Sequence, residues 1–356
     1  MSRRWLWLLP AAAMALCACG RGSVDSTVDL SQDYSAVQPF STSDTRSKHV
    51  GLISDMNIRT EMESGLMDLA KGYFSPDEYT YKVHEFLDYE ELDATDGSRG
   101  LLGTLRDNNP NGLNPSASEE FDTGNGKVTG ATVLYDIYEV DFYRGDQLKG
   151  IALGIVVTDQ LTDDEGNTVP ITDEKMKAYL DVAVPKLVSY MRERFNAVTP
   201  NVPILVGAYE LDHSSNTNNG GYVYMGWFSN GSQKFMDVDQ SWLIVPGAAF
   251  SKADPDMAAE FSSYKEDLQN ILADSSYVTG KAKVQDGKTI RLDITITVNG
   301  KTTGEILAVT QAARDALSVF GQTDCVYRVT VKTAEKVYAV LKRSMHSSQV
   351  EEITLL

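Results

Sequence analysis

Two stretches of the sequence share one order of predicted elements: a strand, a helix and a second strand. In the first stretch, hydrophobic periodicity predicts strands over 128–140 and 151–157, a helix over 173–196 and a strand over 202–209. In the second, it predicts a strand over 292–298, a helix over 303–320 and a strand over 325–332. The tripeptide Val-Thr-Gly begins the first stretch, at 128–130, and precedes the second, at 278–280. This order twice over indicates a tandem repeat.

The connections limit which sheets these strands can form. A strand-helix-strand step requires parallel strands joined by a right-handed crossover. The aromatic-rich segment 221–228 instead predicts a hairpin strand, which needs an antiparallel partner. We therefore expect an α+β fold with mixed sheets, built from two tandem strand-helix-strand repeats.

Helical periodicity also appears outside the two stretches. Apolar residues at helical spacing predict helices over 59–71 and 257–272. Within the helix at 173–196, Thr172 is the expected N-cap, and Pro185 is expected to introduce a kink because it lacks a backbone N–H. Turn-forming residues over 93–126 predict a long loop.

The N-terminus has the composition of a secretory leader. Arg3 and Arg4 precede an apolar run over 5–16, which is short for a membrane-spanning helix and contains Pro10. We therefore favour a cleaved signal over a transmembrane segment.

The end of this leader matches a lipobox. Leu16 stands three residues before Cys19, with the small residues Cys17 and Ala18 between them. We expect cleavage before Cys19 and attachment of a diacylglyceryl group to its sulfur. The membrane is then the predicted partner, with the protein lipid-anchored on its extracytoplasmic face. An ordinary signal peptide cut elsewhere is the alternative.

These observations divide the chain into four parts. Residues 20–47 are polar, with few large apolar groups, and are expected to be a flexible tether. The expected division is a signal peptide over 1–18, the tether over 19–47, an N-terminal α+β repeat over 48–250 and a C-terminal one over 251–356.

Charge and cysteine content exclude some classes of function. The formal net charge of −18 argues against nucleic acid as a partner, because such binding depends on clusters of Lys and Arg. Once Cys17 is removed and Cys19 is acylated, Cys325 is the one remaining cysteine. An internal disulfide is therefore not expected, and Cys325 is predicted to be an inward-facing, unreactive thiol in a strand.

The sequence contains no recognisable catalytic or metal-binding motif. The four histidines, His49, His84, His213 and His346, are scattered, without the spacing of a zinc site. Asp212-His213-Ser214-Ser215 contains the residue types of a catalytic triad, but adjacent residues in a polar loop rarely form one. We therefore expect no enzyme activity, no metal and no cofactor, and keep an extracytoplasmic hydrolase as a remote alternative.

Two groups of aromatic residues could serve a binding function. One lies over 73–81, and the other contains Tyr222, Tyr224 and Trp227. If exposed together, these three side chains would be candidate ligand-binding residues for a glycan or peptide. The alternative, which we favour, is that alternate rings pack into the core of a sheet.

The chain resembles the CamS-type sex-pheromone lipoproteins of Gram-positive bacteria over nearly its whole length. The stretches that carry the resemblance are Asp33-Tyr34, Pro39-Phe40, residues 65–71 with Phe74, Tyr79 and Tyr81, Leu87-Asp88, residues 112–116, residues 149–154, and residues 202–204 through Tyr209.

The resemblance implies a membrane-anchored lipoprotein whose leader is the source of a short pheromone peptide. The corresponding segment would be Ala12–Ala18. It departs from the family's pattern, because it is mostly alanine with Met14, Leu16 and Cys17 where larger branched residues are usual. The expected function is thus a non-enzymatic surface lipoprotein. The alternative is a surface receptor for a solute or glycan.

Overall fold

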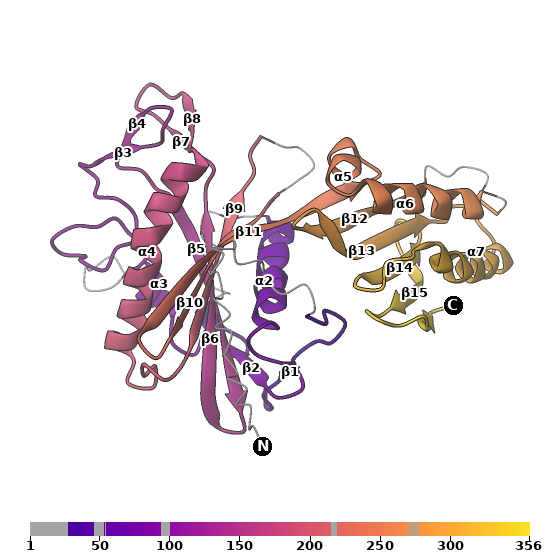
Figure 1. Cartoon of the computed structure of the whole chain (residues 1–356), viewed down its shortest axis with the longest axis horizontal. Coiled ribbons are helices and arrows are strands. Elements are labelled where there is room, and N and C mark those ends of the chain that lie inside the picture. Colours follow the sequence, from indigo (N-terminus) through magenta and orange to yellow (C-terminus); the bar gives the residue numbers. More distant parts are fainter. Residues whose placement is uncertain are drawn as a thin grey trace, which may run out of the picture.

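A mixed sheet of twelve strands extends through both halves of the chain (Figure 1). The computed structural model describes residues 28–45, 53, 55–93, 100–214, 219–269, 271–272 and 277–356. In spatial order the strands are β1 (Ser35–Ala36), β2 (Thr80–Val83), β5 (Leu134–Arg144), β6 (Gln147–Val157), β9 (Ile204–Leu211), β10 (Gly220–Ser229), β11 (Ser232–Val245), β12 (Val278–Gln285), β13 (Lys288–Thr297), β14 (Val326–Lys332), β15 (Val337–Arg343) and β16 (Val350–Thr354).

Two strand-helix-strand steps lie within this sheet. Helix α4 (Asp173–Arg194) connects the parallel strands β6 and β9, and helix α7 (Thr303–Ala316) connects the parallel strands β13 and β14. An antiparallel strand precedes each step and another follows it. The expectation of a mixed sheet combined with helices is confirmed.

The two steps belong to one sheet because β11 pairs with β10 on one side and with β12 on the other. The sequence did not predict β11 or β12. The expected domain boundary at 250/251 falls inside helix α5 (Ala248–Ala253). Val245 and Phe250, which precede this boundary, pack in the same core cluster as β13 and β14.

Helices cover both faces of the first half of the sheet. Along β6, Ile151, Leu153 and Ile155 pack in the core beneath α4. The intervening residues Ala152 and Val156 belong to the core beneath α2 (Met56–Ala70), on the opposite face (Figure 1). Both faces are buried, which is typical of parallel strands.

Helices cover one face of the second half. The apolar residues of β13 and β14 pack against α7 and against α6 (Pro255–Leu268). Residues of the opposite face of these strands, including Arg291, Asp293 and Thr295, line a hollow instead. No helix in the described part of the chain packs flat on this face, which we call the open face.

The remaining elements are short. They are the hairpin β3 (Glu120–Asp122) and β4 (Lys127–Thr129), the hairpin β7 (Gln160–Thr162) and β8 (Thr168–Pro170), helix α3 (Tyr89–Asp93) and the 3₁₀ helix η2 (Leu317–Val319). The predicted strand 128–140 is split between β4 and β5, with Gly130 between them at φ +64°. Helix α4 continues through Pro185, and a capping box at Thr302 and Glu305 begins α7.

Part of the segment expected to be a tether belongs to the folded structure. Tyr34 is buried, and its hydroxyl donates a hydrogen bond to the carbonyl oxygen of Phe74 over 2.5 Å. Ser31 is also buried, and its carbonyl oxygen accepts a hydrogen bond of 2.6 Å from Lys342 on β15. The polar composition of residues 28–45 therefore did not indicate disorder, because these contacts fix the segment to both halves.

Candidate functional site

A groove of about 930 Å³ lies between α2 and the open face of the second half of the sheet. Trp242, Lys281, Arg291 and Arg328, from β11, β12, β13 and β14, form its floor. Thr60, Glu61 and Ser64 of α2 lie on the wall, and Asp33 of the N-terminal segment also lines the groove. The volume is in the range that holds a small ligand.

The open face places its charges in a row across four strands. The strand register aligns Lys281 with Asp293, Asp293 with Arg328, and Arg328 with Lys342. Neighbouring residues in such a row lie close enough to interact directly. The register therefore places Asp293 between Lys281 of β12 on one side and Arg328 of β14 on the other, with Lys342 of β15 next to Arg328.

Most of the cations that line the groove have an anionic partner within the protein. Arg291 forms a forked ion pair with Asp293, with contacts of 3.0 and 2.9 Å, and its guanidinium lies 5.5 Å from the Trp242 ring centroid. Lys281 Nζ lies 3.6 Å from Glu61 Oε2. Among the described residues, Arg328 has neither an ion pair nor a hydrogen bond from its side chain.

Glu61 forms the polar wall of the groove. Burial raises the pKa of its carboxyl, while hydrogen bonds from Tyr209 and Asn219 and the charge of Lys281 oppose this rise. The Tyr209 hydroxyl donates to Glu61 Oε1 over 2.8 Å, which fixes the orientation of the carboxyl group.

A buried cluster of charges connects α2 to the second half of the sheet. Lys283 of β12 is 1% exposed and lies 2.9 Å from Asp68 Oδ2, while Lys71 lies 2.9 Å from Asp68 Oδ1. Burial alone would raise the pKa of Asp68, but the two lysines lower it to about 2. Asp68 is therefore ionised and holds the base of the groove together.

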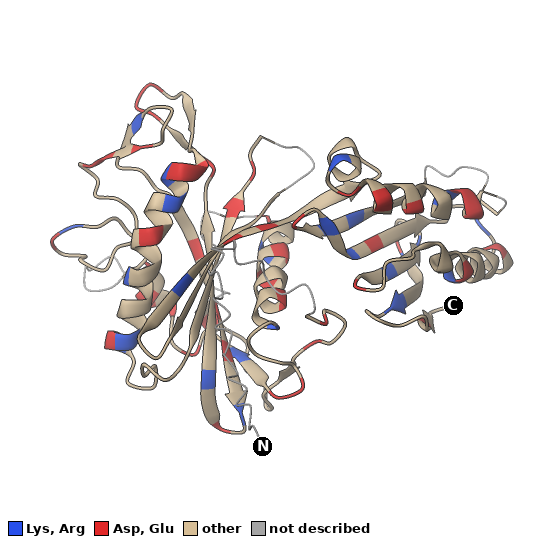
Figure 2. Ribbon diagram, viewed as in Figure 1, with Lys and Arg blue, Asp and Glu red and all other residues tan. Residues whose placement is uncertain are grey.

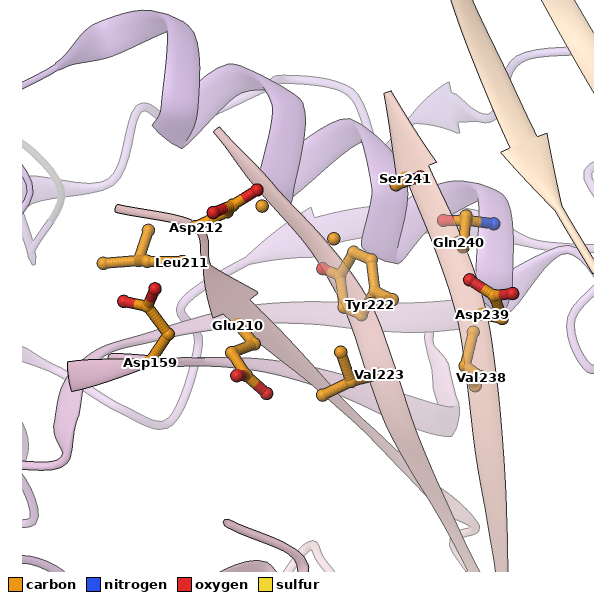
Figure 3. A pocket seen from close by; sticks show the side chains of 12 residues that line it. Asp159, Glu210, Leu211, Asp212, Tyr222, Val223, Val238, Asp239, Gln240 and Ser241 are labelled. Atoms are coloured by element: carbon orange, nitrogen blue, oxygen red, sulfur yellow. The ribbon is translucent and has the colours of Figure 1, made fainter. Parts of the chain in front are cut away.

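A second hollow, of about 240 Å³, lies at the C-terminal ends of the parallel strands β6 and β9 (Figure 3). Asp159, Glu210, Asp212 and Asp239 contribute carboxylates to its lining. Burial raises the pKa of Glu210 to about 7, and the charges of Asp173, Asp159 and Asp212 add to this effect. Among the described residues, no group of three or more His, Cys, Asp or Glu side chains has the arrangement of a metal site.

Two buried carboxyl groups on β5, Glu139 and Asp141, are hydrogen-bonded to the backbone of the segment that follows β2. Glu139 accepts hydrogen bonds from the backbone N–H groups of Phe86 and Leu87, at 2.9 and 2.7 Å, and Asp141 accepts one from Glu85 at 3.2 Å. Burial raises the pKa of both carboxyls, most strongly that of Asp141 beside the charge of Glu139. The pair fixes the connection after β2 onto β5.

The structure buries two of the three candidate aromatic residues. Tyr222 and Tyr224 are 1% and 2% exposed, so they do not form an exposed platform for a glycan or peptide. Tyr222 donates to the carbonyl oxygen of Met62 in α2, and Tyr224 donates to Asp181 in α4. A register shift between them places the two rings in the cores on opposite faces of the sheet. Trp227 is half-buried and stacks on Tyr73.

In the described part of the chain, the contacts of His213 and His84 are not those of a catalytic triad, and His49 lies outside that part. The His213 ring contacts Asp159, whereas the Ser214 hydroxyl donates to Asp212 over 2.6 Å, so Ser214 is not paired with His213. His84 contacts the backbone of Leu87 and Glu139 instead. A hydrolase site therefore has no support at His84 or at the Asp212-His213-Ser214 sequence.

The residues of the lipobox, Leu16, Cys17, Ala18 and Cys19, lie outside the described residues. Cys325 precedes β14, is buried at 1% exposed, and has its thiol pKa raised by burial. None of the helices in the described ranges is both long and apolar enough to cross a bilayer.

The residues that line the groove were not candidates at the sequence level. Their signal is the alternation of β13 and β14, in which polar residues alternate with apolar ones at Asp293, Arg328, Thr330 and Lys332. That alternation indicates that one face of the two strands is polar, but it does not show which element of the chain lies beside that face. The position of α2 beside this face is a tertiary contact between residues more than 200 positions apart, such as Asp68 and Lys283.

The matching family model and the solved structures with a similar fold carry the same description, that of sex pheromone precursors. A family model described as the CamS sex pheromone cAM373 precursor matches residues 40–349. No match was found among curated proteins.

Solved structures share the fold. The sex pheromone precursor from Lactobacillus salivarius subsp. salivarius UCC118 has a TM-score of 0.73 at 20% identity, covering 94% of this chain and 97% of that one. The C-terminal domain of the sex pheromone staph-cAM373 precursor from Staphylococcus aureus has a TM-score of 0.69 at 19% identity, covering 83% and 96%.

Proposed function

Because the chain belongs to the CamS sex pheromone precursor family, we propose that it is a non-enzymatic lipoprotein anchored at Cys19 on the extracytoplasmic face of the cell membrane. The lipobox at 16–19, behind a basic and apolar leader, carries this proposal. A surface location agrees with the family, whose members are described as pheromone precursors.

The fold also limits how far the folded part can lie from the membrane. Residues 20–30 separate Cys19 from Ser31, which is buried against the folded part. Even a fully extended chain of this length spans only about 40 Å. The folded part is therefore held close to the bilayer, rather than on a tether reaching to residue 47.

The test of anchoring is substitution of the acylated cysteine. Cys19→Ala is expected to abolish incorporation of a labelled fatty acid and to stop processing at this position, because the thiol is the acceptor of the lipid. Cys325→Ala is the matched control and should label like the natural chain. Labelling of the Cys19→Ala protein at the normal level would contradict the proposal.

For the leader, we propose export and anchoring without pheromone activity. The segment Ala12–Ala18 is mostly alanine, so it offers less branched apolar surface for recognition than the family's pattern. Synthetic peptide of this sequence should cause no clumping or plasmid transfer in responder cells at nanomolar concentration. A response at that dose would show that the leader is a pheromone source.

A second function, ligand binding by the folded part, is favoured by the groove beside α2. A receptor needs a concave surface with a few polar groups in fixed positions. The groove has this form, with orienting ion pairs at Glu61 and Asp293 and a guanidinium at Arg328 that has no partner among the described residues.

A further inference from the structure

We propose that the groove between α2 and the open face binds an anionic carbohydrate, and that Arg328 binds the anionic group. The proposal rests on the receptor function above and names the ligand that the groove would accept. By an anionic carbohydrate we mean a hydroxyl-rich sugar that carries a carboxylate or a phosphate.

The first argument is the distribution of charge. The chain has a net charge of −18, yet the strand register places Lys281, Lys283, Arg291, Arg328 and Lys342 on the open face. Figure 2 shows Lys and Arg gathered on β12 and β13. The groove lining itself holds three cations, Lys281, Arg291 and Arg328, and three carboxylates, Asp33, Glu61 and Asp293. On a chain that is acidic as a whole, a surface whose charges balance repels an anionic ligand less than the rest of the protein does.

The second argument is whether each cation in or beside the groove already has an anionic partner within the protein. Lys283 is paired with Asp68, Lys281 with Glu61 and Arg291 with Asp293. Arg328 stands next to Asp293 in the register, but Arg291 already engages both oxygens of that carboxylate. The guanidinium of Arg328 therefore keeps its donors for a ligand, and its planar fork matches the oxygens of a carboxylate or phosphate.

The third argument is the chemistry of the surrounding side chains. Thr279 and Thr295 on the floor provide hydroxyl groups that can both donate and accept hydrogen bonds. The hydroxyls of Thr60 and Ser64 on the α2 wall donate to the carbonyl oxygens of Met56 and Glu61, so they can accept a hydrogen bond from a ligand. Trp242 and Ile244 add apolar surface on β11. Hydroxyls beside an aromatic ring suit a sugar, whose ring has apolar faces and a polar rim.

The experiment measures binding by calorimetry with the full chain purified in detergent. The probes are trigalacturonate for the carboxylate arm, mannose 6-phosphate for the phosphate arm, maltotriose as a neutral sugar and triglutamate as an acidic peptide. We expect at least one of the anionic sugars to bind and maltotriose to bind at least tenfold more weakly. The stronger of the two anionic probes identifies the anionic group.

Substitution then tests the assigned residue. Arg328→Ala should weaken binding of the anionic sugar by about 10- to 100-fold, the loss expected for a charge-assisted hydrogen bond. Arg328→Lys should recover part of this loss, because it keeps the charge but not the fork. Lys332→Ala is the matched control, since it removes a cation from the same face of β14 outside the groove, and it should change binding less than threefold.

A second variant tests the groove without altering its charges. Ser64 is exposed on α2, so Ser64→Trp should fill the groove without disturbing the core and reduce binding tenfold or more. Unchanged thermal unfolding of each variant shows that the fold is retained.

Three results would overturn the proposal. Equal losses in Arg328→Ala and Lys332→Ala would indicate general attraction by charge and no site at Arg328. Binding of triglutamate as tight as that of the sugars, and equally dependent on Arg328, would keep the receptor function but replace the carbohydrate by an acidic peptide. Absence of binding to both anionic sugars at millimolar concentration would refute the ligand class, while anchoring at Cys19 would be unaffected.

Discussion

Each half of the sheet contains a strand-helix-strand step, but the two halves differ in what covers them. In the first half, α4 packs on one face and α2 on the other, so β6 and β9 are buried on both sides. In the second half, α6 and α7 cover one face, and the equivalent strands β13 and β14 present charged and hydroxyl residues on the other. The second half is thus the one that offers a surface for binding.

Close packing explains why α2 lies on the first half. A Cβ atom added at Gly65 of α2 would lie 2.7 Å from the Tyr222 ring, and one added at Gly207 of β9 would lie 2.8 Å from the same ring. Glycine at both positions lets the Tyr222 ring lie between helix and sheet. On the second half, α2 makes its contact through Asp68 and Lys283, which bridge to β12.

The largest expected effect is on the connection between the halves. Asp68→Asn leaves Lys283 and Lys71 buried without their carboxylate, which should lower the free energy of unfolding by about 3–5 kcal/mol. Chemical denaturation measures this loss. A matched Asp293→Asn variant, at a half-exposed ion pair, should lose about 1 kcal/mol or less.

The pH dependence of stability gives this prediction a second readout. The folded pKa of Asp68, about 2, lies below the ordinary value of 3.8 for an aspartate, so its contribution to stability is fully present above pH 3.8. That contribution is lost as the pH falls through the folded value. In this range the stability of Asp68→Asn should fall less steeply than that of the natural chain. Parallel curves for the two proteins would mean that Asp68 is not held ionised by the lysines.

A reciprocal exchange tests the covered and open faces directly. Val156 of β6 is fully buried beneath α2, so Val156→Thr adds a hydroxyl without an evident partner and should cost about 1–3 kcal/mol. Thr330 lies half-buried on the open face of β14, and Thr330→Val should change stability by about 0.5 kcal/mol or less. Equal costs for the two would remove the distinction between the halves.

The smallest expected effect concerns the approach of α2. Gly65→Ala should lower the free energy of unfolding by about 1 kcal/mol, because the clash with Tyr222 outweighs the gain in helix propensity. Gly304 of α7 has open space around its added Cβ, so Gly304→Ala should leave stability unchanged or raise it by about 0.5 kcal/mol. Stabilisation by both substitutions would show that α2 does not pack closely on Tyr222.

Much of the secondary structure followed from the sequence. Long periodic segments predicted α2, α4, α6 and α7 to within a few residues at most ends. The strands β6, β9, β13 and β14 were also predicted, because their apolar runs are long or strictly alternating. Strands β2, β15 and β16 were not predicted: β2 is short and has no fully buried residue, β16 is mostly exposed, and the apolar alternation of β15 is broken by Arg343 at a buried position.

The candidate site was predicted less well. Core packing of the aromatic rings was the favoured expectation, and Tyr222 and Tyr224 are buried, but the sequence did not show that a register shift in β10 sends them to opposite cores, beneath α2 and α4. A bulge of one residue reverses which face each side chain occupies, and local sequence does not specify it. The charged residues of the groove were visible only as the polar side of alternating strands.

By itself, the sequence determined the longer helices α2, α4, α6 and α7, the parallel steps across α4 and α7, and the lipobox that predicts an anchor at Cys19. These depend on residue periodicity and on short motifs. Only the tertiary structure decided that β11 and β12 join the two steps into one sheet, that residues 28–45 are packed, and that α2 stands beside the open face. The reason is that pairing partners and helix positions depend on contacts between distant residues, such as Asp68 with Lys283, which no local pattern contains.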